Sequence, residues 1–187
     1  MWTRNELLDL GLTDYQIRCR ISEGTLVRLR RNCYIAAEAS AKDKLAAVAQ
    51  LYPDAVFTGT AALAAYGLCE VRLPATIRVD NNCRARADGL VRTVRSRPVP
   101  VNRVKGVKMA LPAQAVADAL SFERCGEWLL KEALAQAYRG LNGRGRFAAD
   151  LEMVSSKEKD AVRELAELAP VGTASKWEQR MFREMRR

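Results

Sequence analysis

The chain has 187 residues, 49% of them hydrophobic and 28% charged, which is enough apolar material for one large or two small folded domains. Its formal net charge is +9, which favours a polyanionic partner such as nucleic acid, although a positive surface can also serve solubility alone. It contains no histidine, so Ser-His-Asp and Cys-His nucleophilic sites, a histidine general base and histidine-ligated zinc are excluded. Chemistry on carboxylates, lysines or carboxylate-bound Mg²⁺ remains.

Compartment and cofactors are constrained by what the sequence lacks. No apolar run approaches the ~20 residues of a membrane-spanning helix, and the N-terminus has no signal-peptide pattern. The 5 cysteines are scattered without a C-x-x-C pair, which indicates neither a zinc site nor a disulfide framework. We therefore expect a cytoplasmic protein that is not an enzyme and needs no metal or cofactor.

The first residues predict a pair of helices. Thr3 is a suitable N-cap for a helix over Arg4–Leu10, and Glu6 completes the capping-box pattern. Gly11 ends this helix in a tight turn, and Thr13 can cap a second helix after it.

A basic hairpin is predicted to follow. Ile17 and Ile21 mark the inward side of the second helix, and Gly24 is suited to end it. Residues 25–36 then read as two strands, with Asn32 at positive φ in the turn. Helix, turn, helix and basic ribbon are typical of a winged helix-turn-helix, which we expect over residues 1–39. The other interpretation is an ordinary helix and hairpin with a solvated basic edge.

This module supplies the predicted DNA contacts. Gln16 is the expected base-edge contact, since its amide can pair with adenine through two hydrogen bonds. Arg28, Arg30 and Arg31 would hold the DNA backbone or minor groove from the wing. A winged helix normally has a helix ahead of this pair, so a later segment or a partner chain must cover that side. The full predicted set is Tyr15, Gln16, Arg18, Cys19, Arg20, Thr25, Arg28, Arg30, Arg31 and Asn32.

Residues 40–187 are expected to form a mixed sheet with a packed helix, and helices from about residue 112, so the fold class is α+β. Thr60 is the predicted N-cap of the alanine-rich helix. Strands are predicted within 55–58, 76–80, 90–94 and 101–109, with turns at 80–82 and 105–106. Helices are predicted at 40–52, 60–66, 112–120, 127–138, 147–168 and 175–187.

The segment LLDLGLTDYQIRCRISEGTLVRLRRNCYIAA resembles the N-terminal module of the AbiEi-type antitoxins of bacterial toxin–antitoxin systems. In that family a recognition helix leads to a glycine and a "lvRlrrGvY" wing, and Asn32 stands here in place of the wing glycine. The resemblance continues in AVFTGTAALAAYGL, where Tyr66 stands where many relatives carry histidine, and in GVKMALPAQAVADAL. The matching wing residues are Gly24, Leu26, Arg28, Arg30, Arg31 and Tyr34.

This resemblance implies a DNA-binding repressor of its own promoter, acting at inverted repeats, whose C-terminal part neutralises a nucleotidyltransferase toxin. A homodimer on DNA would fit two modules on such a repeat, about 34 Å apart per helical turn. An antitoxin that acts purely by protein–protein binding is an alternative.

Two further patterns leave enzyme alternatives open. Gly59-Thr60 with Asp80 is weakly similar to the phosphate turn and acidic pair of a nucleotidyltransferase, but Arg78 occupies the place of the first carboxylate. Ser175 and Glu178 resemble the start of a Vsr-like endonuclease domain, which longer relatives carry, although such a domain needs further acidic residues and a lysine beyond Glu178 to hold metal and activate water. A degenerate or truncated nucleic-acid enzyme is therefore the other reading.

Two basic segments outside the wing are candidate secondary contacts for nucleic acid or a partner. The run Arg139–Arg146 reads as an inter-helix loop whose Arg144 and Arg146 could contact phosphate, or as a solvated loop. The C-terminal helix would carry Arg180, Arg183 and Arg187 on one face, or simply be a solvated helix.

Overall fold

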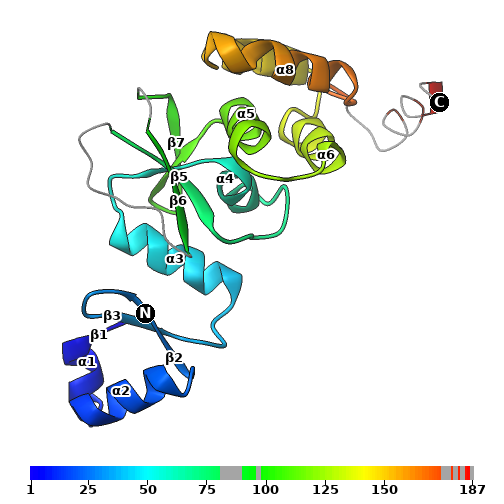
Figure 1. Cartoon of the computed structure of the whole chain (residues 1–187). Coiled ribbons are helices and arrows are strands. Elements are labelled where there is room, and N and C mark those ends of the chain that lie inside the picture. Colours follow the sequence, from blue (N-terminus) through cyan, green and yellow to red (C-terminus); the bar gives the residue numbers. More distant parts are fainter. Residues whose placement is uncertain (81–89, 96–97, 174–177, 179–180, 182–183, 186–187) are drawn as a thin grey trace. The chain divides into compact units, whose positions relative to one another are not determined.

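The computed structural model describes residues 1–80, 90–95, 98–173, 178, 181 and 184–185. The chain divides into two compact units, Met1–Pro53 and Asp54–Arg187 (Figure 1). The division lies beyond the boundary predicted at residue 39, so the helix that follows the hairpin groups with the N-terminal unit. The fold is α+β, with two sheets.

The N-terminal unit combines short helices with a three-stranded antiparallel sheet of order β1-β3-β2. Strand β1 lies ahead of the helix pair and pairs with β3, so that Trp2 is opposite Tyr34. The sequence analysis did not predict this strand, because two residues are too few to show alternation. The elements are β1 Trp2–Thr3, α1 Arg4–Asp9, α2 Asp14–Ser22, β2 Leu26–Arg30, β3 Cys33–Ala36 and α3 Ala41–Leu51.

Local signals position these elements as expected. Thr3 with Glu6 and Thr13 with Gln16 both form complete capping boxes. Gly24 has φ +74° after α2, and Asn32 has φ +63° in the hairpin turn, a conformation that asparagine tolerates better than most residues. A small core cluster lies between the helix pair and the sheet: Leu7, Ile17, Leu26 and Tyr34 are buried, and partly buried side chains surround them. Ile35, Ala47 and Val48 are also buried in this unit.

The C-terminal unit contains a mixed five-stranded sheet of order β6-β5-β4-β8-β7. Helix α4 packs on β5 and α5, and α5 also contacts the three later helices (Figure 1). The strands are β4 Val56–Phe57, β5 Ala75–Val79, β6 Val91–Arg95, β7 Val101–Val104 and β8 Val107–Ala110. The helices are α4 Gly59–Ala65, α5 Pro112–Phe122, α6 Glu127–Ala137, α7 Gly143–Glu152 and α8 Ser156–Glu167.

Two boundary predictions in this unit were wrong, and one turn prediction was confirmed. Thr60 lies inside α4, and the N-cap is Thr58, whose hydroxyl bonds to Asp118 instead of capping the helix. The turn predicted at Lys105-Gly106 joins β7 and β8, which pair as a hairpin. The helix predicted over 147–168 is interrupted between α7 and α8, where the Ser155 hydroxyl donates to Glu158 at 2.7 Å.

Candidate nucleic-acid interface

The outward side of α2 presents Tyr15 and Arg18 to solvent. Tyr15 is 72% exposed, and Arg18 is exposed one helical turn further on. The Arg18 Nε donates to the Asp14 carbonyl oxygen at 3.4 Å, which leaves its terminal nitrogens free of any ion pair within the described residues. Cys19, on the same side, is half-buried. This side of α2 therefore offers an aromatic ring and a cation one turn apart.

Gln16 is already engaged in the cap of α2. Its Oε1 accepts from the Thr13 backbone N–H at 2.8 Å, while the Thr13 hydroxyl accepts from the Gln16 N–H at 3.2 Å. Pairing with adenine through two hydrogen bonds uses both the oxygen and the nitrogen of the amide. Gln16 must therefore leave the cap to read adenine in that way, or contact DNA through Nε2 alone.

Arg20 does not share the surface of Arg18. Two positions along a helix correspond to a rotation of roughly 200°, and Arg20 accordingly lines a groove with apolar residues of the core. Thr25 lines the same groove, and its hydroxyl donates to the Arg20 carbonyl oxygen at 3.1 Å. The structure thus separates these two predicted contacts from Tyr15 and Arg18.

The hairpin divides its arginines between the two faces of the sheet. Arg28 is opposite Tyr34, so it lies on the face that carries the core and the helices. A bulge between Arg28 and Arg30 shifts the register, and Arg30 is opposite Cys33, on the other face. There the Arg30 guanidinium lies 5.9 Å from the centre of the Tyr52 ring, a cation–π contact.

Arg31 and Asn32 are exposed in the turn between β2 and β3. Within the described residues neither Arg28 nor Arg31 forms an ion pair. Of the three predicted wing arginines, Arg28 and Arg31 thus have no ion-pair partner in the part of the chain that the structure describes, whereas Arg30 lies over the Tyr52 ring.

An ion pair neutralises the one acidic side chain in the first turn of α2. The Arg4 guanidinium binds both carboxylate oxygens of Asp14, the Nε–Oδ1 distance being 2.8 Å. Hydrogen bonding by Arg4 lowers the pKa of Asp14, so this carboxylate stays ionised and paired. The pair joins α1 to α2 and offsets a negative charge that would repel phosphate beside Tyr15 and Arg18.

In the C-terminal unit, the turn that could have held phosphate is filled by the protein itself. The Glu123 carboxylate accepts from the Thr60 backbone N–H at 3.1 Å and from the Thr76 hydroxyl at 2.6 Å. Gly59 has φ +59°, and a Cβ there would overlap the Glu123 carboxylate. An anion at this turn would therefore meet an existing negative charge, which argues against a nucleotidyltransferase-type phosphate site.

Arg78, which stands where a nucleotidyltransferase would carry the first carboxylate of its acidic pair, forms a buried ion pair with Asp118. The Arg78 Nε donates to Asp118 Oδ2 at 2.6 Å, and Asp118 is fully buried. Gln114 Nε2 also donates to Asp118, at 3.0 Å, and the Thr58 hydroxyl completes the set. Sequence reasoning missed both Asp118 and Glu123, although a lone carboxylate within the apolar run of α5 was the available signal for Asp118.

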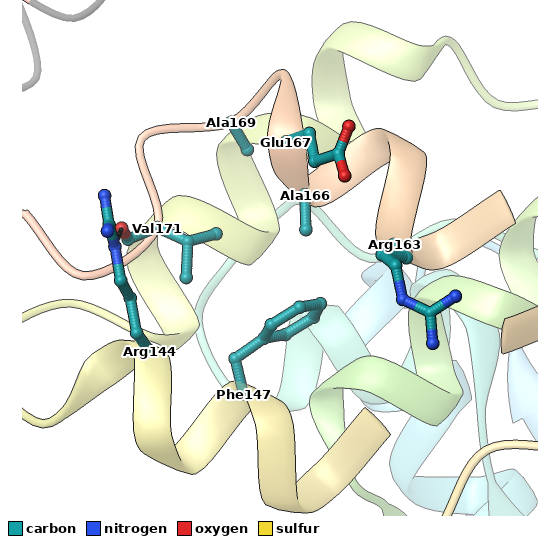
Figure 2. A pocket seen from close by; sticks show the side chains of 7 residues that line it. All are labelled: Arg144, Phe147, Arg163, Ala166, Glu167, Ala169 and Val171. Carbon is teal, nitrogen blue, oxygen red and sulfur yellow. Dashed lines mark hydrogen bonds between the residues drawn. The ribbon is translucent and has the colours of Figure 1, made fainter. Parts of the chain in front are cut away.

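The secondary basic residues have different outcomes. Arg144 and Arg146 lie in the first turns of α7 and not in a loop, because the helix begins at Gly143. The Arg144 Nε donates to the Val171 carbonyl oxygen at 3.4 Å, and the terminal Arg146 Nη2 donates to the Arg139 carbonyl oxygen at 2.9 Å. Arg144 lines a pocket of about 340 Å³ with Phe147 and Arg163 (Figure 2). Arg180, Arg183 and Arg187, and Ser175 of the tail pattern, lie outside the described residues.

Replacing Glu123 with alanine is expected to lower the free energy of unfolding of the C-terminal unit by about 1–3 kcal/mol, since the Thr60 N–H and Thr76 hydroxyl lose their acceptor. Glu123→Gln, which keeps an acceptor, should lose less. Urea unfolding followed by circular dichroism measures both. Equal stability of Glu123→Ala and the unmodified chain would contradict the capping role.

Within the described residues, no helix combines the length and apolarity required to cross a bilayer. No group of three or more histidine, cysteine, aspartate or glutamate side chains is arranged to hold a metal ion in the same part of the chain. Comparison with protein-family models and with curated proteins found no match, so the function is argued from the geometry of the interface.

Proposed function

We propose that the N-terminal unit is a winged helix-turn-helix and that the chain is a sequence-specific DNA-binding regulator of transcription. The observation that carries this proposal is a set of exposed cations on α2 and the hairpin that have no ion-pair partner among the described residues, Arg18, Arg28 and Arg31. The order of elements supports the assignment: a strand is followed by two helices and then by the hairpin. Because β1 pairs with β3, the hairpin becomes part of a three-stranded sheet, which is more stable than an isolated hairpin.

The proposed contacts fall into two groups, those that recognise base edges and those that bind the phosphate backbone. Tyr15 and Arg18 present groups to the major groove, the ring for a thymine methyl and the guanidinium for guanine or phosphate. Arg28 and Arg31 contact phosphate from the wing. Arg30 contributes less, since its guanidinium is partly satisfied by Tyr52. Gln16 can pair with adenine through both atoms of its amide only after its Oε1 has left the Thr13 N–H.

The direct test is a mobility-shift assay of the full chain on the DNA upstream of its own gene, with a scrambled duplex of equal length as control. The proposal expects preference for the upstream DNA. Equal binding to both duplexes would remove sequence specificity, and no binding to either would remove the proposal.

The change Gln16→Glu separates the two roles of this residue. Glutamate at this position preserves the capping box, so the thermal midpoint should stay within a few degrees of the unmodified chain. Affinity for the upstream DNA should fall about tenfold or more, because a carboxylate repels phosphate and cannot donate to adenine N7. Gln16→Ala is the comparison that also loses the side-chain half of the capping box, the bond from the Thr13 N–H to Gln16 Oε1. Undiminished DNA binding by Gln16→Glu would place Gln16 outside the interface.

The resemblance to AbiEi-type antitoxins extends this proposal to a toxin–antitoxin system. In that setting the chain represses its own promoter at inverted repeats and neutralises a nucleotidyltransferase toxin encoded beside it. Co-expression with the neighbouring gene tests the second part. The proposal expects growth arrest by the neighbour alone and relief by this chain, and a harmless neighbour would contradict it. We propose no enzymatic activity, in keeping with the carboxylate that fills the Gly59-Thr60 turn.

A further inference from the structure

A groove of about 510 Å³ opens into the core of the N-terminal unit. Its walls include Trp2, Leu7, Leu12 and Leu26, which are half of the eight side chains in the core cluster of this unit. Leu7 and Leu26 are buried at the floor of the groove, whereas Trp2 and Leu12 are only partly buried. The apolar surface that these two side chains leave in contact with water carries a cost that burial against a partner would relieve. A core this small gains more from such cover than a large one.

The rim of the groove carries charges of both signs and an exposed apolar side chain. Arg20, Glu23 and Glu38 line it, and within the described residues none of the three forms an ion pair. Leu10 also lines the groove and is 67% exposed. The same patch therefore contains an apolar side chain that protrudes and an apolar groove that could receive one.

We propose that this groove is covered by the same groove of a second copy of the chain. In a two-fold contact each patch meets itself, so a self-complementary patch must carry both charge signs and both a projection and a recess. The groove meets these requirements: Leu10 of each copy enters the groove of the other, and Arg20 of each faces Glu23 or Glu38 of the other. A nucleic acid would be repelled by the two glutamates, and a partner of one charge sign would leave Arg20 or the glutamates unmatched.

The contact extends the proposed function, because two copies on inverted repeats would be held together through it. It is nevertheless measured without DNA, on the full chain, by sedimentation velocity over a range of micromolar concentrations. A monomer that still binds the upstream DNA would remove the dimer and leave the proposed function standing. A dimer that fails to bind the upstream DNA would support the contact and remove the proposed function.

Leu10→Asp should weaken the dimer by about tenfold or more, a loss equivalent to about 1.4 kcal/mol. Leu141→Asp is the matched control, since Leu141 is 93% exposed in the C-terminal unit and should leave the dimer unchanged. Circular dichroism confirms that both variants are folded.

A charge exchange provides a second, independent test. Arg20→Glu alone should also weaken the dimer, and Arg20→Glu combined with Glu23→Arg and Glu38→Arg should restore it, because each copy then presents the reversed pattern to its partner. A chain that is monomeric at every concentration overturns the proposal. So does a dimer that Leu10→Asp leaves intact, or one that the exchanged charges do not restore.

Discussion

Replacing Asp118 with alanine is expected to lower the free energy of unfolding of the C-terminal unit by about 3–5 kcal/mol. Asp118 is fully buried and accepts hydrogen bonds from Arg78, Thr58 and Gln114. Its removal takes a buried carboxylate away from the Arg78 guanidinium, which is itself only 8% exposed. Urea unfolding of the full chain measures the loss.

Two controls separate the buried ion pair from a general effect of removing a charge. Glu127→Ala breaks an exposed pair with Lys131 and should cost at most about 0.5 kcal/mol. Arg78→Met with Asp118→Leu removes both buried charges and should recover much of the stability lost by Asp118→Ala. A loss of similar size for Asp118→Ala and Glu127→Ala would contradict the importance of burial.

The second large effect concerns DNA. Changing Arg18, Arg28 and Arg31 together to alanine is expected to reduce affinity for the upstream duplex by about a hundredfold or more, since three cations without protein partners no longer bind phosphate or a base. The control removes three exposed cations of the C-terminal unit, Arg103, Arg124 and Lys157, and leaves affinity within a few-fold. Both variants lose three positive charges, so a difference in affinity between them reports where the cations lie and not the net charge of the chain.

Single substitutions compare how much each hairpin arginine contributes to DNA affinity. Arg28→Ala should weaken binding more than Arg30→Ala, because Arg28 lies on the face of Tyr34 and the core cluster, whereas the bulge after it turns Arg30 towards Tyr52. The reverse order would mean that the second face of the hairpin contacts DNA.

Features that depend on a few neighbouring residues were predictable from the sequence. The capping box at Thr3, the N-cap at Thr13 and the left-handed conformations at Gly24 and Asn32 are each determined by residues within three or four positions, and all four are present. Their energies are local, so a sequence pattern carries most of the information.

Features that join distant segments were not predictable. Glu123 accepts from the N–H of Thr60, 63 positions away, and so binds the first turn of α4, whose N-cap is Thr58 and not the Thr60 that the local pattern indicated. The one-residue bulge in β2 likewise reverses the face of Arg30, and alternation along the strand cannot reveal it. Long-range packing and strand register therefore decided which of the predicted contacts share a surface.

The break between α7 and α8 was a missed local signal. Ser155 and Glu158 have the spacing of a helix start, and their side chains are hydrogen-bonded at 2.7 Å. The helical spacing of apolar residues before and after Ser155 concealed this start, because the two segments had the apolar pattern of one continuous helix.

The dependence of DNA affinity on salt tests the central claim most directly. Each cation that neutralises a DNA phosphate contributes roughly 0.9 to the slope of log K against log salt. The variant lacking Arg18, Arg28 and Arg31 should therefore show a slope shallower by roughly 2–3 than the unmodified chain on the upstream duplex, while the variant lacking Arg103, Arg124 and Lys157 keeps the original slope. An unchanged slope in the first variant, or an equal change in both, would contradict a DNA interface built on α2 and the hairpin.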